Sequence, residues 1–258
     1  MQNNTFSTLF VGQNLIKLKE VDSTNNFLKE LLSKSEPLAE GTVIMADNQF
    51  SGRGQQESIW QTEPGKNISM SIYLKPGFLP INKQFYLNIA VSLAVSDAFM
   101  HFVTSGIKVK WPNDIYYLNK KVGGILIENT LTGAAFKSSV IGIGLNINQV
   151  IFPEVITDKA TSLAQILQKE IDLMKILEKI SIFIEKYYLI LKSGQYDILH
   201  KNYLSRLYNY QVRASYIHNG EVFEGKITGI EDVGRLIIET AIDQKVFNFK
   251  EVEFIHTK

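Results

Sequence analysis

Residues 110–128, KWPNDIYYLNKKVGGILIE, place a cation and bare backbone where a hairpin that only packs would carry apolar side chains. Two strand-like runs are joined by a polar turn, and the second run opens on Lys121 and continues through Gly123 and Gly124. Val or Ile would be expected at such strand positions. A partly desolvated lysine above glycines suits stabilisation of negative charge developing on a carboxylate or phosphoryl oxygen. Taken alone, Lys121 is better explained as a solvated hairpin lysine. A role in charge stabilisation therefore depends on which residues lie near it.

A polar break stands before this hairpin. Pro112 disfavours a regular central strand, and Asn113 and Asp114 offer an amide and a carboxylate at the break. Because Lys121 follows Asp114 by seven positions, a hairpin brings the two ends into one neighbourhood. An edge strand that enters a turn with an Asx motif explains the same residues without any chemistry.

A second candidate is the glycine-containing loop SGRG at 51–54. Gly52 and Gly54 let the backbone approach a ligand, and Arg53 can pair with a carboxylate or a phosphate. The pattern is neither a P-loop nor G-x-G-x-x-G, and a flexible surface loop accounts for it equally well.

Two further groups are ambiguous on their own. GIGLNIN at 142–148 ends a buried strand with Asn146 and Asn148, which suit either a base or ribose edge or the last backbone groups of the strand. Trp60 suits the core, the rim or a stacking surface for a purine.

The elements that must position these residues follow from apolar periodicity. Helices are predicted at 21–34, 83–102 and 172–192, and buried strands at 41–47, 67–74 and 138–148. After about Tyr208 short alternating strands, with turns at 218–220, 232–234 and 243–244, are typical of a small antiparallel barrel. We therefore predict two domains, 1–208 and 209–258.

Composition narrows the function classes. The 258 residues carry a formal charge of +1, so no global field attracts nucleic acid or an anionic membrane. Cys is absent, which excludes disulfides, thiolate metal sites and a Cys nucleophile. The four His are scattered, and neither a targeting segment nor an 18-residue apolar stretch is present, so the cytoplasm is the expected location.

The order of the segments is more specific than any one of them. VDSTN (21–25), QFSGRG (49–54), KWPND (110–114), KVGGILIE (121–128) and GIGLNIN (142–148) together resemble the signature segments of biotin protein ligases, also called biotin-[acetyl-CoA-carboxylase] ligases. The resemblance runs from about Val21 to the C-terminus. KWPND followed by K-x-GG is highly specific as a pair.

This resemblance implies an α+β fold with a mixed sheet flanked by helices, similar to class II aminoacyl-tRNA synthetases and lipoate ligases, and a C-terminal SH3-like barrel. It implies that biotin and ATP, with Mg²⁺, give biotinyl-5′-adenylate and pyrophosphate. A lysine of the biotin carboxyl carrier protein of acetyl-CoA carboxylase then attacks the mixed anhydride. No DNA or membrane partner is expected, and the resemblance leaves monomer and homodimer open.

The resemblance also implies three groups of site residues. Biotin contacts are expected from Ser23, Thr24, Gln49, Gly52, Arg53, Lys121 and Gly124. ATP or adenylate contacts are expected from Arg53, Gly54, Trp60, Asn113, Lys121 and Asn146. Lys121 and Arg53 are expected to be catalytic by neutralising two anions held in line, and Asp114 to hold Mg²⁺ or to place the lysine.

Two departures from the family pattern carry expectations. Residues 55–58, QQES, follow GRG where familiar members have further Arg and Gly, so we expect weaker retention of the adenylate. Only about 20 residues precede VDSTN, which leaves no room for a DNA-binding helix-turn-helix domain. We therefore expect a monofunctional ligase without repressor activity.

Two alternatives remain. A lipoate or octanoyl ligase of the same superfamily would lack KWPND followed by K-x-GG, and labelled biotin against labelled lipoate separates the two. The C-terminal barrel would also suit a nucleic-acid or peptide-binding module. Near-zero net charge and the lack of an aromatic-basic stripe argue against the nucleic-acid version.

Overall fold

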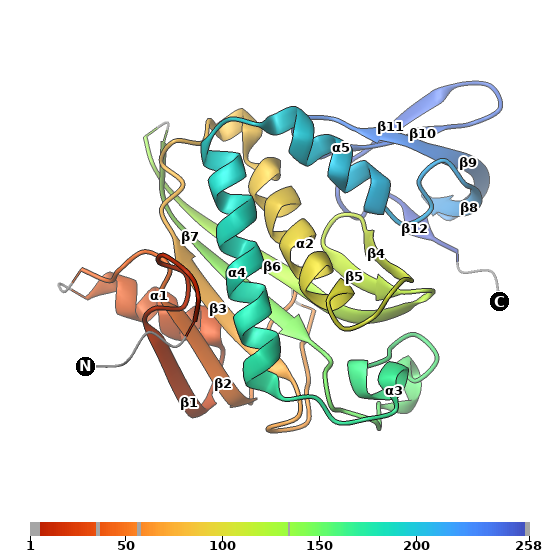
Figure 1. Cartoon of the computed structure of the whole chain (residues 1–258). Coiled ribbons are helices and arrows are strands. Elements are labelled where there is room, and N and C mark those ends of the chain that lie inside the picture. The colour runs from red at the N-terminus through yellow and green to blue at the C-terminus, as the bar shows by residue number, and fades with distance from the viewer. Residues whose placement is uncertain (1–5, 35–36, 56–57, 134, 256–258) are drawn as a thin grey trace.

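A seven-stranded mixed sheet lies at the centre of the computed structural model, which describes residues 6–34, 37–55, 58–133 and 135–255 (Figure 1). Its order is β1-β2-β3-β7-β6-β5-β4. β1 and β2 are parallel, and every other neighbouring pair is antiparallel. The strands are β1 Leu15–Val21, β2 Val43–Gln49, β3 Ile68–Leu74, β4 Ile107–Lys110, β5 Asp114–Tyr117, β6 Lys120–Thr132 and β7 Ala135–Leu145.

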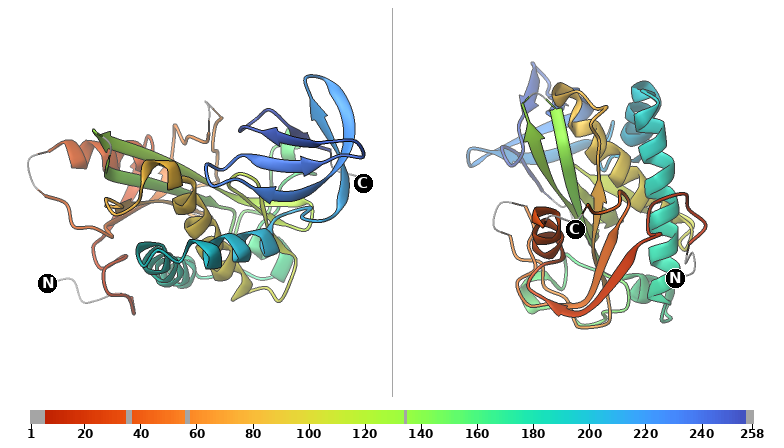
Figure 2. Two further views of the ribbon diagram at one scale, coloured as in Figure 1. Left: turned by 90° about the horizontal axis from the view of Figure 1, so that it is seen from above. Right: turned by 90° about the vertical axis from the view of Figure 1, so that its left-hand side faces the viewer.

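Helices cover both faces of this sheet, as Figures 1 and 2 show. α1 (Thr24–Ser33) lies on one face, while α2 (Phe85–Met100) and α4 (Leu173–Lys192) pack together on the other. α2 is buried on nearly all sides because it contacts the sheet, α4 and α5 (Tyr196–Arg206). The three predicted helices are therefore present, with slightly shorter bounds.

Some elements have no counterpart in the sequence prediction. They are β1, α5, the short helix α3 (Leu163–Leu167) and two 3₁₀ turns, η1 (Ile81–Lys83) and η2 (Glu154–Ile156). The region around KWPND, predicted as one strand with a polar break, consists of two separate strands. β4 ends at Lys110, a cis Trp111–Pro112 bond follows, and β5 starts at Asp114. The predicted hairpin is thus a three-stranded meander.

The alternation of side chains on β7 explains where the sheet is open. Ile141, Ile143 and Leu145 face the main core on the α2 side. On the opposite face Val140 joins the small core under α1. The next residues on that face are Gly142 and Gly144, whose missing side chains leave room above the sheet for Asn25 and Trp60. On this face the sheet therefore presents glycine backbone in place of side chains, and we call this part, Gly142 and Gly144, the bare floor of the sheet.

The C-terminal part forms a separate five-stranded antiparallel sheet, in the order β11-β10-β9-β8-β12. Its strands are β8 Arg213–His218, β9 Glu221–Ile230, β10 Leu236–Glu239, β11 Gln244–Phe247 and β12 Glu253–Phe254. Asn219 and Gly220 have φ of 50° and 81°, as a two-residue hairpin requires. The α+β architecture with a small C-terminal SH3-like sheet agrees with expectation, while the boundary near 208 stays a prediction.

The KWPND turn is anchored in this C-terminal sheet. Trp111 is 4% exposed, and its indole Nε1 donates to the Gly234 carbonyl at 2.8 Å. Its ring lies 5.3 Å from that of Phe249. Asp232 in the same turn as Gly234 accepts hydrogen bonds from Lys83 and Tyr86. Contacts between the main sheet domain and the C-terminal part thus hold the turn before β5 in place.

Within the described ranges, none of the helices combines the length and the apolar character that crossing a bilayer requires.

Candidate active site

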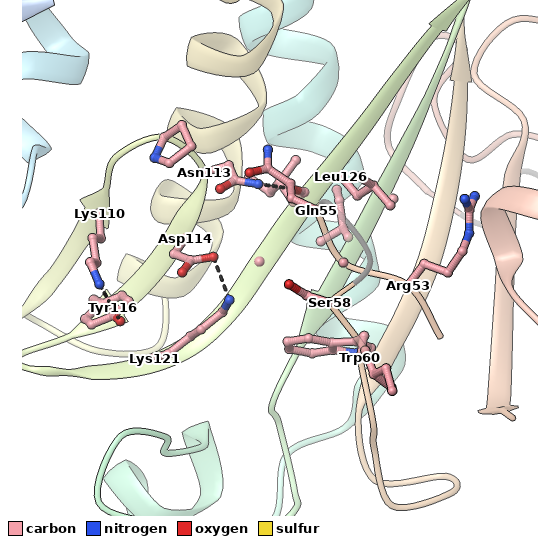
Figure 3. A pocket seen from close by; sticks show the side chains of 18 of the residues that line it. Arg53, Gln55, Ser58, Trp60, Lys110, Asn113, Asp114, Tyr116, Lys121 and Leu126 are labelled. Carbon is pink, nitrogen blue, oxygen red and sulfur yellow. Dashed lines mark hydrogen bonds and ion pairs between the residues drawn. The ribbon is translucent and has the colours of Figure 1, made fainter. Parts of the chain in front are cut away.

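A pocket of about 620 Å³ opens over the bare floor of the sheet (Figure 3). Its walls come from the start of α1, the glycine loop with Trp60, the β4–β5–β6 meander and residues 250–254 of the C-terminal part. This volume is typical of a site for a small organic ligand.

A β-bulge determines which way Lys121 points. Asp114 pairs with Gly124, and Tyr116 pairs with Lys121, so Val122 is an extra residue opposite the register shift. Side chains alternate along a regular strand, which would put Lys121 and Gly124 on opposite faces. The bulge restores Lys121 to the pocket face and sends Val122, fully buried, into the core.

Lys121 is held at its side chain and at its backbone. Its Nζ lies 2.6 Å from Oδ1 of Asp114 and 5.9 Å from the Trp60 ring centroid. A Cβ added to Gly124 would lie 3.3 Å from that Nζ, so bare backbone sits directly beside the ammonium. The Lys121 amide donates to Lys159 O at 2.8 Å, which fixes the strand from its other side. With 33% of its side chain exposed, Lys121 faces the pocket rather than bulk solvent.

A second lysine, Lys110, belongs to the same cluster although sequence reasoning missed it. Its Nζ donates to Tyr116 Oη at 3.2 Å and lies 5.1 Å from the ring centroids of Tyr116 and Phe254. Burial lowers the pKa of Lys110; the Asp114 carboxylate opposes this and the Lys121 charge reinforces it. Burial and Asp114 raise the pKa of Tyr116. Positive charge is therefore concentrated on one pocket wall.

Neutral hydrogen-bonding groups line the end of the pocket near α1. The Thr24 amide and hydroxyl donate to Gln49 Oε1 at 2.8 and 3.1 Å. The Ser71 hydroxyl lies 2.7 Å from Thr24 Oγ1 and 2.5 Å from Asn25 Oδ1. A Cβ at Gly142 would lie 2.6 Å from Asn25 Oδ1, so glycine makes room for this amide. Such donors and acceptors suit an uncharged polar ligand group.

Arg53 extends away from the Lys121–Asp114 pair, as Figure 3 shows. Its Nη2 lies 2.9 and 3.1 Å from the two carboxylate oxygens of Glu128. Glu128 also accepts from Lys29 and Asn25, each at 2.8 Å. Burial alone would raise the pKa of Glu128, but the bonds from Lys29 and Asn25 and the Arg53 charge lower it below its ordinary value.

The structure gathers most of the predicted site residues around this one pocket. Those that line it are Ser23, Thr24, Gln49, Arg53, Gly54, Trp60, Asn113, Asp114, Lys121 and Gly124. Gly52 and Asn146 are not among the lining residues. A Cβ at Gly52 would lie 2.2 Å from Trp60 O, and the Asn146 amide donates to Thr161 O at 3.2 Å. Their roles, like those of the lining residues, stay predictions.

Two of the predicted residues also serve the local structure. The Asn113 amide donates to Ile125 O, which ties the turn before β5 to β6. Trp60 lies on Gly144, where a Cβ would come within 2.4 Å of the indole. Its Nε1 is buried without a hydrogen-bond partner among the described residues, so a ligand acceptor would satisfy it. Of the QQES segment, Gln55 and Ser58 line the pocket, and residues 56 and 57 lie outside the described ranges.

Other pocket residues were not predicted. They include Asn25, Lys110, Tyr116, Gly144, Lys159, Lys250, Glu253 and Phe254. Asn25 ends VDSTN and Lys110 opens KWPND, so both stand inside motifs that the sequence already singled out. The residues after 249 carry no local signal, because their place in the pocket depends on how the C-terminal sheet docks.

A metal site made by the protein alone is not found within the described ranges, where no three or more acidic or histidine side chains cluster suitably. Asp114 remains a candidate, since Mg²⁺ commonly takes one or two carboxylates together with substrate phosphates and water. Its Oδ1 contacts Lys121, and 26% of its side chain is exposed. The donor set therefore fits a metal that arrives with a nucleotide.

Comparison with known proteins places these features in a family. Residues 18–146 match the biotin/lipoate A/B protein ligase family, and residues 209–254 match the biotin protein ligase C-terminal domain. The chain is 34% identical to the bifunctional ligase/repressor BirA of Bacillus subtilis over 238 residues, which are 90% of this chain and 71% of that protein. It is 30% identical over 157 residues to the biotin--[acetyl-CoA-carboxylase] ligase of Mycobacterium tuberculosis, covering 59% of this chain and 56% of that one.

Solved structures agree with the sequence relatives. The biotin protein ligase of Aquifex aeolicus in complex with biotin and ATP superposes with a TM-score of 0.79 at 29% identity, covering 95% of this chain and 99% of that one. The chain therefore belongs to the biotin/lipoate A/B protein ligase family, as a biotin protein ligase.

Proposed function

We propose that this chain uses ATP to activate biotin as biotinyl-5′-adenylate and then transfers biotin to a lysine of a biotin carboxyl carrier protein. The observation that carries the proposal is the Lys121 ammonium, which the bulge in β6 places beside Asp114 and Gly124 on the pocket wall. The end of the pocket near α1 offers uncharged donors and acceptors with Arg53 beside them, and the opposite wall carries Lys110 and Lys121. That arrangement suits a ligand with a neutral polar head and an anionic end.

In the first step the biotin carboxylate attacks the α-phosphorus of ATP. A carboxylate oxygen forms the new bond to phosphorus, and the bond to pyrophosphate breaks. Two anions must approach each other, so the protein contributes positioning and positive charge rather than a side-chain nucleophile. Lys121 would neutralise the carboxylate and the phosphoryl oxygens. Lys110, held on the same wall, adds to the positive potential there.

Mg²⁺ would be held by Asp114 together with the nucleotide phosphates. Its chemistry would be to neutralise phosphate charge. The same carboxylate positions the lysine, since its Oδ1 lies 2.6 Å from Lys121 Nζ. Asp114 would thus both position the Lys121 ammonium and bind the metal ion.

In the second step the acceptor lysine, as a neutral amine, attacks the carbonyl carbon of the mixed anhydride. An amide bond forms, AMP leaves with the electron pair of the broken anhydride bond, and the amine loses a proton. We propose that the acceptor is a carrier domain of a carboxylase. Absence of repressor activity stays a prediction, and salt-sensitive binding to a specific DNA duplex would contradict it.

The test is incubation with biotin, MgATP and an isolated carrier domain, followed by intact mass. We expect the carrier to gain one biotin, and to gain none when its acceptor lysine is replaced by Arg. A parallel reaction with lipoate distinguishes the related ligases. Transfer of lipoate but not of biotin would refute the proposal.

A further inference from the structure

Arg53 is paired with Glu128 and not with the groups around Lys121. Glu128 lies on β6, and the side chains of the pair are 39% and 25% exposed. Figure 3 shows the arginine extending to one side of the pocket while Lys121 turns toward Asp114 on the other. Two cations expected to act on one ligand therefore point to different places.

The geometry of β6 shows how far apart these places are. Beyond the bulge, the residues of β6 on the pocket face are Gly124, Leu126 and Glu128, since side chains alternate. At about 3.3 Å per residue, Glu128 lies about 13 Å along the strand from Gly124. Gly124 marks the position of the Lys121 ammonium, because a Cβ there would lie 3.3 Å from Nζ. While the Glu128 pair persists, Arg53 and Lys121 are thus directed to well separated positions of β6, and we do not expect them to contact one phosphoryl group together.

Of the two partners, Glu128 is the fixed one. Asn25 and Lys29, both on α1, donate to its two carboxylate oxygens at 2.8 Å each. Asn25 is itself 3% exposed and is bonded to Ser71, so it cannot follow a moving carboxylate. Arg53 stands on a loop outside the sheet; the backbone bonds beside it, from Gly54 to Ser58 and from Trp60 to Gly52, stay within the loop, and no sheet strand bonds Arg53 among the described residues. A change of partner therefore moves the arginine.

We propose that Glu128 is a positioning residue that occupies Arg53 as a substitute anion, and that a phosphate-bearing ligand beside Lys121 must replace Glu128 to recruit it. Glu128 thereby lowers the affinity of the pocket for the adenylate while leaving the affinity for a neutral biotin derivative unchanged. The lowered pKa of Glu128 agrees, because the carboxylate stays charged. This inference rests on the proposed function, since it takes an adenylate as the ligand.

The test compares two ligands by calorimetry. One is a biotinyl-adenylate analogue whose anhydride carbonyl is replaced by a methylene, which keeps the phosphodiester charge; the other is biotin amide, which is neutral. Glu128→Gln keeps an acceptor for Asn25 but loses the charge. We expect it to bind the analogue about threefold to tenfold more tightly, as for loss of one partly exposed ion pair, and the amide unchanged.

Two further variants test whether the gain in affinity for the analogue comes from releasing Arg53. In an Arg53→Ala background, Glu128→Gln should give no gain, because the competing pair is already absent. Glu224→Gln makes the same charge change at an exposed pair, Glu224 with Arg213, and should alter neither affinity. Weaker binding of the analogue by Glu128→Gln, or a gain that persists without Arg53, would overturn the inference. Failure of the unaltered chain to bind either ligand would instead refute the proposed function.

A second measurement needs no change at Glu128. Nitrogen-15 spectra of the Arg53 guanidinium, assigned by its loss in Arg53→Lys, report whether the carboxylate pairing restricts rotation of the Nη groups. We expect the signature of pairing with Glu128 in the free protein and a different set of shifts with the analogue bound. Unchanged guanidinium signals on saturation would show that the pair persists in the complex, which the inference forbids.

Discussion

Gly123 and Gly124 stand side by side in the sequence, and we expect alanine to have opposite consequences at the two positions. Neither glycine has a positive φ, so the backbone accepts alanine at both. A Cβ at Gly123 would lie 2.4 Å from a methyl of Leu145 and 2.8 Å from the Gly144 carbonyl oxygen. A Cβ at Gly124 would lie 3.3 Å from both Lys121 Nζ and Asp114 Oδ1, the mobile ends of two side chains.

These distances set the magnitudes. Gly123→Ala overpacks the main core against backbone, and we expect a loss of about 1–3 kcal/mol in the free energy of unfolding. Gly124→Ala should change that free energy by only about 0.5 kcal/mol, because its close neighbours are the mobile ends of two partly exposed side chains. If biotin binds as proposed, the methyl group would instead meet the biotin chain, and it would also disturb the Lys121–Asp114 pair. We expect biotin to bind about tenfold to a hundredfold more weakly, or about 1.4–2.7 kcal/mol.

Urea unfolding followed by circular dichroism measures the first quantity, and calorimetric titration with biotin measures the second. Gly77→Ala serves as the control, since its nearest neighbour would be a carbonyl oxygen at an ordinary 3.6 Å. If Gly124→Ala bound biotin like the parent, or if it proved the less stable of the pair, the face assignment of β6 would be wrong.

Three other perturbations test separate parts of the structure. Lys121→Ala should slow adenylate formation by orders of magnitude, measured by pyrophosphate exchange, while the unfolding midpoint stays close to that of the parent. Trp111→Phe removes the hydrogen bond to Gly234 and leaves its carbonyl unpaired, so it should cost about 1–3 kcal/mol in urea unfolding; an unchanged midpoint would contradict the anchoring. Glu128 has a lowered pKa, so its ion pairs add stability above its ordinary value of 4.5 that is lost as the pH falls through the folded-state value. The difference in thermal midpoint between parent and Glu128→Gln should therefore shrink on acidification from about pH 6 to about pH 3, and a constant difference would refute the assignment.

The loop after Gly54 offers a further comparison. Gln55 lines the pocket where family members were expected to carry positive charge. Gln55→Arg should slow dissociation of the adenylate in a chase experiment, because a second loop cation faces the phosphate. An off-rate equal to that of the parent would count against the expectation of weak retention.

Local patterns in the sequence were sufficient to predict three of the helices, several strands and ten of the residues that line the pocket. The apolar stripe of α4, the long apolar run of α2 and the capping signal before α1 depend on nearby residues alone, so local patterns predicted these helices. β1 was missed because its alternation is confined to residues 16–19 and none of its residues is fully buried, since it lies at the sheet edge. α5 was missed for a comparable reason, because only Leu199 and Tyr203 of its side chains are buried.

What the sequence did not reveal depends on contacts between distant segments. Glu128 looks like the end of an apolar strand, and nothing nearby indicates that α1 and the glycine loop both reach it. Sequence reasoning gives Lys110 no role although it opens the KWPND motif. Its environment includes Phe254, which is distant in the sequence, so no local pattern could indicate it. The direction of Lys121 depends on a register shift, which no residue preference announces.

That shift has a consequence for how this hairpin tolerates length changes. Because one supernumerary residue, Val122, sets the side of the sheet to which the ammonium belongs, the spacing between Lys121 and the glycines obeys an odd–even rule. An even spacing, as after loss or gain of one residue, would keep the cation on the pocket face in a regular strand, whereas the odd spacing of three found here does so only through the bulge. Variants that lack the bulge but keep the odd spacing, and not those that differ in length by one residue, are therefore the ones that would turn the ammonium into the core.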